Sequence, residues 1–335
     1  MNRRTLVAVV WSATALFIAA PLAAQLPPDR ADMLAHLDAA ITLADAVPSA
    51  LVQLIETQEN EGSVVVGSGE SAQTIGVQYG YRETRTERRS QTINGERRRL
   101  DRIFRTVEDR GMEGTERRLK IDAELRVIEG DVFVRARYRA PDAEGATSEP
   151  RILPDAPPLP EGWIVYNDDA LERYPGLGLL EIDPDNTDDE VIRFELLEVL
   201  VREAVSIETE PRPEGGERII LHLDGAGARA FFEASAEQQG NADEPLSQAL
   251  FGALREEDCA STMYIDIRRD GMFVGIEWAL PVVFNPIELN TIEPDAPPGI
   301  FMEMVMDFSM DNRYLGPDEG PMIEAPPRFN AARTP

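Results

Sequence analysis

The side chains that most often perform catalysis or bind metals are scarce in this chain. It contains two histidines, His36 and His222, and one cysteine, Cys259. The histidines lack the short spacing of a metal site, and neither stands beside a residue that it could activate as a nucleophile. Cys259 has no neighbouring histidine either, and we expect it to be a buried apolar residue rather than an intermolecular link. We therefore predict no metal site, no cofactor and no enzymatic activity.

The acidic segment 183–189 has the composition of a calcium-binding loop but not its pattern. Such a loop needs glycine at its sixth position and glutamate at its twelfth, where this chain has Asp188 and Phe194. The run Thr187-Asp188-Asp189-Glu190 instead matches a helix capping box, in which acidic side chains offset the helix dipole. The 61 Asp and Glu residues also leave open a hydrolase with paired carboxylates, but they single out no particular acid.

An alternating apolar row near the C-terminus offers a stronger indication of function. It consists of Met302, Met304, Met306, Phe308 and Met310, which would share one face of a strand because successive side chains point to opposite faces. Methionine is flexible and polarisable, so it adapts to apolar partners of varied shape. A plain core strand is the alternative, but this concentration of methionine favours the wall of an apolar cavity.

The net charge of −28 limits the partners. Residues 82–139 carry 17 basic and 12 acidic side chains, whereas residues 140–335 carry 13 basic and 41 acidic ones. Nucleic acid and anionic membrane surfaces attract basic proteins. We therefore predict no nucleic-acid partner.

The N-terminal segment has the pattern of a secretory signal peptide. Arg3 and Arg4 precede an apolar run from Leu6 to Ala20, and a small-residue site for cleavage follows at Ala24. An uncleaved anchor is the alternative, but the run is shorter than the ~20 residues that a spanning helix needs. We predict a signal peptide over 1–24, a single domain over 25–326 and a flexible tail over 327–335.

Four segments have the apolar spacing of helices. They are 29–56, which Pro48 interrupts, and the segments 191–201, 225–239 and 245–256. Proline-rich connectors at 153–160 and 293–299 separate the predicted groups of helices and strands, and we interpret them as stiff linkers that lead into strands.

Three hairpins are predicted from turn residues and tested by register, because directly opposite residues share a face. A turn at Glu129-Gly130 gives one apolar face and one face of opposite charges. The apolar face pairs Val127 with Val132, Leu125 with Val134, Ala123 with Ala136, and Ile121 with Tyr138. The charged face pairs Glu124 with Arg135 and Asp122 with Arg137. A two-residue turn at Asp270-Gly271 also gives an apolar face; it pairs Ile267 with Val274, Ile265 with Ile276, and Met263 with Trp278.

The third hairpin, with its turn at Asn94-Gly95, has no apolar face. Its register pairs Arg88 with Asp101 and Glu87 with Arg102. We interpret it as a ribbon with two solvated faces that projects beyond the core, and the alternative is a different register. The Arg-rich segment 82–105 could also contact acidic head groups or a partner, but its cross-strand acids favour a solvated face.

Taken in chain order, these elements resemble the half-open β-barrel family of LolA, LppX and LprG, periplasmic lipid- and lipoprotein-binding proteins whose relatives include the sensor RseB. The resemblance covers roughly 40–326. The segments that carry it are Gly162-Trp163-Ile164-Val165-Tyr166, the Leu-rich helix from Val191 to Val201, Leu223 to Phe232, the hairpin from Tyr264 to Gly271, and Gly320 to Pro326.

The resemblance implies an α+β fold, a curved antiparallel half-open β-barrel with helices covering its concave face. It implies an exported, non-enzymatic protein that holds a lipid or acylated ligand in an apolar cavity. The sheet side of that cavity would be lined by Met302, Met304, Met306, Phe308, Ile265 and Trp278, and the helix side by Leu197, Leu200 and Phe231. The alternative is a regulatory module of RseB type that reports lipid state to a membrane or envelope protein.

This sequence departs from the lipoprotein members of the family, because no cysteine follows the apolar run of the signal peptide. A lipid anchor is therefore not expected. The expected location is the periplasm or the exterior, as a free protein.

Overall fold

The computed structural model describes residues 28–111, 116–180 except 140–158, and 194–326 except 239. The predicted signal peptide, the segment 183–189 and the tail 327–335 lie outside the described residues. Within the described part, no helix is both long and apolar enough to cross a bilayer.

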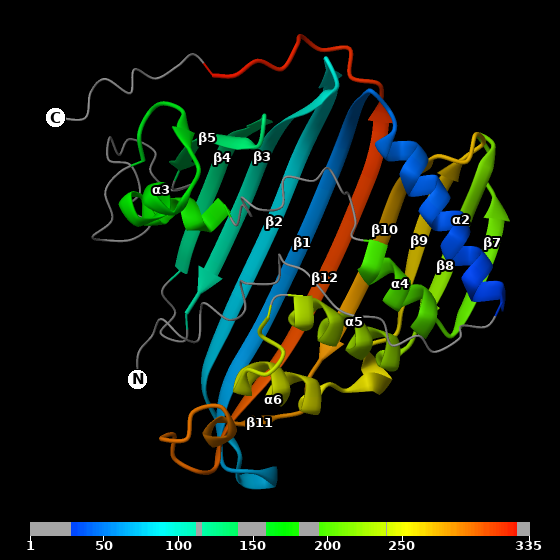
Figure 1. The fold of residues 1–335 in the computed structure, drawn as a ribbon. Helices are drawn as coiled ribbons and strands as arrows, with labels where there is room; N and C mark the ends of the chain where they lie inside the picture. The colour runs from blue at the N-terminus through cyan, green and yellow to red at the C-terminus, as the bar shows by residue number, and fades with distance from the viewer. Residues whose placement is uncertain (1–27, 112–115, 140–158, 181–193, 239, 327–335) are drawn as a thin grey trace.

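One antiparallel sheet of twelve strands forms the frame of the molecule (Figure 1). Its strand order is β6-β5-β4-β3-β2-β1-β12-β10-β9-β8-β7, with β11 paired to β12 outside this path. The strands are β1 (Ser49–Val66), β2 (Gln73–Ile93), β3 (Glu96–Arg110), β4 (Glu116–Ile128), β5 (Asp131–Arg139), β6 (Ile164–Val165), β7 (Ser206–Pro211), β8 (Gly216–Leu223), β9 (Ser261–Arg268), β10 (Phe273–Val283), β11 (Ile287–Glu288) and β12 (Ile300–Gly316).

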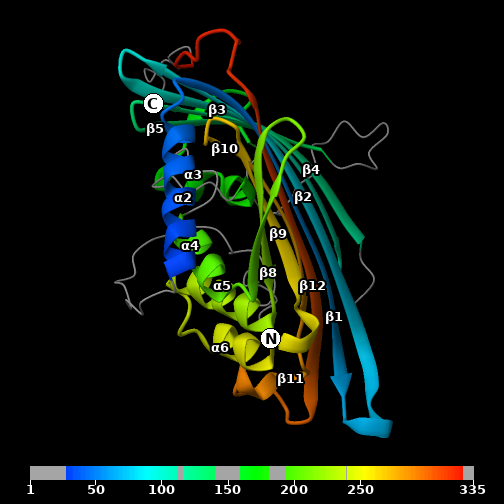
Figure 2. The ribbon, with the colours of Figure 1, turned by 90° about the vertical axis from the view of Figure 1, so that its right-hand side faces the viewer.

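The sheet curves without closing, and helices lie against its concave face, as Figure 2 shows. The predicted α+β fold class, a half-open antiparallel sheet with helices on the concave side, is therefore confirmed. The helices are α2 (Pro28–Asp45), α3 (Asp168–Arg173), α4 (Phe194–Glu203), α5 (Gly225–Gln238) and α6 (Pro245–Ala253).

Two separate apolar clusters lie on the concave face. The larger one packs α2, α4, α5 and α6 against β8, β9, β10 and β12, around the fully buried Trp278. The ring of Trp278 meets those of Phe231 at 4.8 Å and Phe308 at 6.0 Å, both edge to face, which is a favourable aromatic geometry. The smaller cluster packs α3 and the 3-10 turn Pro175–Leu180 against β3, β4 and β5.

The long strands β1 and β2 run between these two helix groups (Figure 1). Each apolar cluster is built on its own side of the sheet, and the backbone ladder of β1, β2 and β3 joins them. The centre of the concave face therefore has a different environment from its two sides.

The first predicted hairpin is confirmed in every pair. Strands β4 and β5 pair Ile121 with Tyr138 and Leu125 with Val134, with a turn at Glu129 and Gly130. Both turn residues have positive φ, 56° and 83°, as a tight hairpin turn of this kind requires.

The second predicted hairpin is confirmed at two of its three pairs. Ile265 faces Ile276 and Met263 faces Trp278, but Ile267 faces Phe273 rather than Val274. The loop closes between Arg268 and Met272, and a bulge between Phe273 and Gly275 absorbs the extra residue. A bulge changes the pairing only on the turn side of it, so the register away from the turn was still correct.

The third hairpin has the predicted register, with Arg88 opposite Asp101 and Glu87 opposite Arg102. Its interpretation as a ribbon projecting beyond the core is wrong. Strand β3 pairs along its length with β4, and β2 pairs with β1, so the hairpin lies inside the sheet. Asp101 is 3% exposed.

The predicted helix over 29–56 is also wrong in its second half. Helix α2 ends at Asp45, and β1 begins at Ser49. Pro48 disfavours a helical conformation in the residue before it, and its carbonyl accepts the amide of Thr92, which starts the β1–β2 ladder. The helix predicted over 245–256 ends at Ala253. The two other predicted helices are present as α4 and α5 within the described residues.

After β12, residues 317–326 cross to the outer face of β2, β3 and β4. We call this segment the C-terminal strap. Asp318 forms two hydrogen bonds with the guanidinium of Arg89, at 2.9 and 3.0 Å. Ile323 is buried against Leu100 and Ile128. The strap therefore covers the convex side and leaves the concave side unaffected.

Candidate functional site

The methionine-rich strand β12 contributes a row of partly exposed apolar side chains to the concave face. This Met row consists of Met302, Met304, Met306, Phe308 and Met310, all of which pack against the larger apolar cluster without being fully buried. Intervening residues such as Glu303 and Val305 point to the convex side and are exposed. The row thus separates a packed core from the open centre of the sheet.

The nine predicted lining residues fall into two groups. Ile265, Trp278, Leu197 and Leu200 are fully buried and pack as core. Phe231 and the four predicted residues of the Met row are half-buried. All nine surround the same cluster, but only the second group presents surface that a ligand could contact without unpacking the core.

Beside the Met row, two glycines leave the concave face without side chains. Gly62 on β1 lies opposite Met304, and Gly80 on β2 lies opposite Asn60, which faces Met306. Among the described residues, a Cβ on Gly62 would meet only the carbonyl oxygen of Glu303 at 3.6 Å, and one on Gly80 only the amide of Asn60 at 4.0 Å. We call this pair the glycine window, because it allows a ligand to approach the backbone.

A glutamine marks the boundary between the apolar row and the polar centre. Gln58 is 8% exposed and donates from Nε2 to the sulfur of Met306 at 3.3 Å. Its Oε1 accepts a hydrogen bond of 3.0 Å from Arg82. A single side chain therefore connects the Met row to a guanidinium group.

The polar centre is lined with arginine. The arginine strip consists of Arg82 and Arg88 on β2 and of Arg99 and Arg105 on β3, whose side chains share the concave face by register. Asp101 accepts two hydrogen bonds from Arg88, at 3.1 and 3.2 Å, and lies 3.3 Å from Arg99. The sequence analysis noted the arginines of segment 82–105 as contacts for acidic head groups or a partner but favoured a solvated face, and it did not place them on the concave face beside the Met row.

The far side of the strip lies near a partly buried tyrosine, Tyr138. Arg105 donates to Thr84 at 3.0 Å. Tyr138 on β5 donates its hydroxyl to the carbonyl of Gly176 at 2.5 Å. Burial raises the pKa of Tyr138, and the positive charge of Arg105 only partly opposes that rise. Tyr138 is therefore a neutral hydrogen-bond donor and not a base.

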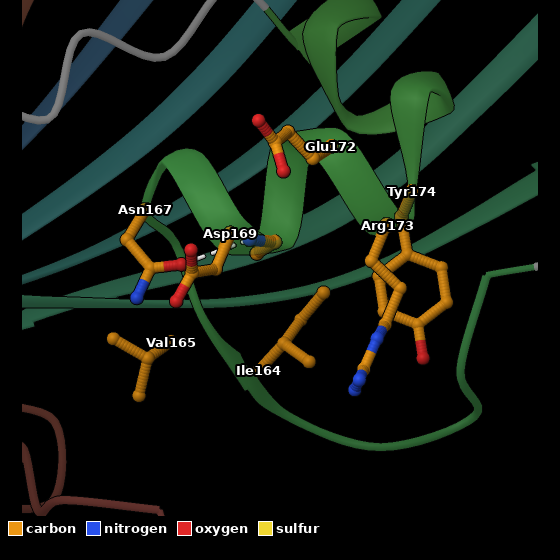
Figure 3. A pocket seen from close by; sticks show the side chains of 8 residues that line it. Ile164, Val165, Asn167, Asp169, Glu172, Arg173 and Tyr174 are labelled. Atoms are coloured by element: carbon orange, nitrogen blue, oxygen red, sulfur yellow. Dashed lines mark hydrogen bonds between the residues drawn. The ribbon is translucent and has the colours of Figure 1, made fainter.

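A cavity of about 610 Å³ lies at the other end of the sheet, between β6 and α3 (Figure 3). Its lining residues are Ile164, Val165, Asn167, Asp169, Ala170, Glu172, Arg173 and Tyr174. Figure 3 shows Arg173 and Tyr174 on the same side of α3 as Ile164, whereas Glu172 points away. Asn167 caps the helix by accepting the amide of Ala170 at 2.9 Å. These residues include no nucleophile with a base beside it.

The histidines and the cysteine have structural surroundings. His36 contacts Glu217 at 2.5 Å, and His222 lies 3.3 Å from the hydroxyl of Thr262. Cys259 is buried and donates to the carbonyl of Arg255, and burial raises the pKa of its thiol. No group of three potential metal ligands occurs among the residues that the structure describes.

Comparisons with known proteins identify no family for this chain. No family model matches it, and no curated protein matches it. Among solved structures, it is similar to a β-barrel-like protein of the domain of unknown function DUF1849 from Brucella abortus. That similarity has 11% identity, covers 77% of this chain and 95% of the other, and has a TM-score of 0.15. A likeness at this level carries no argument about function and gives no support to the LolA and LppX family.

Proposed function

We propose that this protein is an exported, non-enzymatic binding protein that holds a lipid or a lipidated ligand on the concave face of its sheet. The observation that carries this proposal is the Met row, five half-buried apolar side chains at the border of a packed core. Methionine side chains adapt to varied apolar shapes, and partly exposed ones retain surface for a ligand to cover.

The surroundings of the Met row support a binding role. The glycine window lies directly beside it, so an acyl chain could lie along β12 and contact the backbone of β1. Each methylene group removed from water contributes roughly 0.8 kcal/mol. Binding would therefore need no specific polar contact along most of the chain.

Export follows from the predicted signal peptide over 1–24, and the expected compartment is the periplasm or the exterior. The half-open sheet with helices on its concave face agrees with the resemblance to LolA, LppX and LprG that the sequence suggested. That family membership remains part of the proposal.

The test begins with the full chain, expressed with its signal peptide so that it is exported, and purified without detergent. Native mass spectrometry and organic extraction should reveal a lipid at a stoichiometric amount. A protein free of lipid that also refuses added fatty acids and phospholipids would contradict the proposal. That outcome would favour a regulatory module of RseB type with a membrane or envelope partner.

Two neighbouring substitutions on β12 test which face of the sheet binds the lipid. Met304→Asp should abolish lipid uptake without unfolding the protein, because it puts a charge on the concave side. Val305→Asp is the matched control, since Val305 is 42% exposed on the convex side. Equal uptake by the two folded variants would show that the Met row is not the binding surface.

A further inference from the structure

The centre of the concave face has the opposite charge to the protein as a whole. The chain carries a net charge of −28. On the concave face of β1, β2 and β3, the register nevertheless places more basic than acidic side chains. The basic ones are Arg82, Arg88, Arg97, Arg99 and Arg105, and the acidic ones are Glu56, Asp101 and Asp109.

Several of these arginines bind groups on neighbouring elements. Arg97 donates to the carbonyls of Asp45 and Val47 at the end of α2. Arg88 and Arg99 share the single carboxylate of Asp101.

Arg82 occupies the position closest to the Met row. It reaches Gln58, and Gln58 reaches the sulfur of Met306, at 3.0 and 3.3 Å. A molecule whose apolar part lies on Met304 and Met306 would therefore have its next atoms beside the guanidinium of Arg82. Guanidinium groups bind carboxylates and phosphates through paired, charge-assisted hydrogen bonds.

We propose that the ligand is an anionic amphiphile, whose acyl chain lies on the Met row and whose carboxylate or phosphate head group binds at the arginine strip through Arg82. This inference rests on the proposed lipid-binding function and adds the charge and direction of the ligand. The surface that receives the head group faces the concave side, so it is distinct from the basic side chains on the convex side of β3, β4 and β5.

Matched probes test the head group. Binding of dodecanoate, dodecyl phosphate and 1-dodecanol to the full chain is measured by calorimetry below the concentrations at which they aggregate. Both anions should bind at least tenfold more tightly than the alcohol, since hydrogen bonds to charged groups contribute that much or more. Inorganic phosphate alone should bind far more weakly than dodecyl phosphate, and equal affinity would overturn the proposal in favour of a free-anion site.

Matched variants test the residue. Arg82→Gln should weaken dodecanoate binding roughly 10- to 100-fold and leave 1-dodecanol binding nearly unchanged, whereas Arg82→Lys should restore part of the loss. Arg85→Gln is the control, because Arg85 lies three residues along β2 on the opposite face and its side chain is 53% exposed. Thermal unfolding confirms that each variant folds.

The outcomes separate this inference from the proposed function. If neither the anions nor the alcohol binds, the lipid-binding function itself fails. If all three bind equally and Arg82→Gln binds them like the parent protein, the lipid-binding function stands and the anionic head group is refuted.

Discussion

The glycine window provides a sharp test of where a ligand lies. Gly62 faces Met304 across the β1–β12 pair, and its backbone does not have the positive φ that only glycine adopts readily. A Cβ there would make an ordinary contact of 3.6 Å with the carbonyl of Glu303. Gly62→Val should therefore be tolerated by the fold while filling the window with three carbon atoms.

The two expected effects have opposite directions. Replacing a glycine in the middle of a strand removes an entropic cost of roughly 0.5–1 kcal/mol, so the free energy of unfolding should rise slightly. An acyl chain displaced from the window would lose the burial of about two or three methylenes, each worth about 0.8 kcal/mol. Because about 1.4 kcal/mol corresponds to a tenfold change, the affinity should fall roughly 10- to 50-fold.

Displacement of a fluorescent fatty acid measures the affinity, and thermal unfolding measures the stability. The control is Ser63→Val, which places the same valine side chain at the next residue of β1 on the convex face. If Gly62→Val is folded and binds as tightly as the parent protein, then the ligand does not cross the window. The placement of the ligand beside Met304 would then be refuted.

Two further predictions concern the accessibility of Cys259 and the stability that the C-terminal strap provides. Iodoacetamide should alkylate Cys259 far more slowly in the native protein than in guanidinium, because the thiol is buried and burial raises its pKa. Intact-mass spectrometry measures both rates, and equal rates would show that the thiol is accessible in the native protein. Burial alone would raise the pKa of Asp318, but hydrogen bonds from Arg89, the amide of Gly320 and Gln91 outweigh it, and the pKa is lowered. The strap therefore stabilises the protein above the unfolded-state pKa of about 3.9, and this contribution is lost as the pH falls through the lower folded-state value. Asp318→Asn should lower the free energy of unfolding at pH 7 by about 1–3 kcal/mol and flatten its acid dependence, and an unchanged denaturation curve would contradict that role.

The parts of the fold that local patterns determine could be predicted in detail. The β4–β5 hairpin was predicted pair by pair, because an apolar face and a face of opposite charges together allow only one register. The β9–β10 hairpin was predicted away from its turn only. The Asp270-Gly271 pair is typical of a two-residue turn. The alternation of apolar and polar residues along β9 and β10 does not predict the bulge near Val274, which accommodates a longer loop.

Other parts depend on contacts that no local pattern contains. Leu51, Leu54 and Ile55 fit helical spacing, yet they lie in β1, where pairing with both β2 and β12 decides the conformation. Tertiary pairing overrides intrinsic preference in such ambiguous segments. The Met row, by contrast, was predicted as one face of a strand and is found so, because its alternation spans five residues without interruption.

The arginine strip shows why the candidate site could be predicted only in part. A hairpin without an apolar face was interpreted as a projecting ribbon, since isolated polar strands have no core to cover. Its true position between two apolar clusters follows from the strand order, which depends on pairings far apart in the chain. Arg82 and the Met row are neighbours only because β1 pairs with both β2 and β12 in this strand order.

The polar centre is also where this chain departs most from the usual rules for building a core. Arg99, Asp101 and Arg105 are each less than a tenth exposed, and burying charges costs free energy that their pairing need not recover. Apolar residues at these positions would merge the two clusters into one larger core. A sequence that keeps buried charges where apolar side chains would fit is most readily understood if the charges serve a purpose other than stability. Under the proposal made above, this purpose is to fix the head group and the direction of an amphiphilic ligand, because Arg82, the glycine window and the Met row are adjacent.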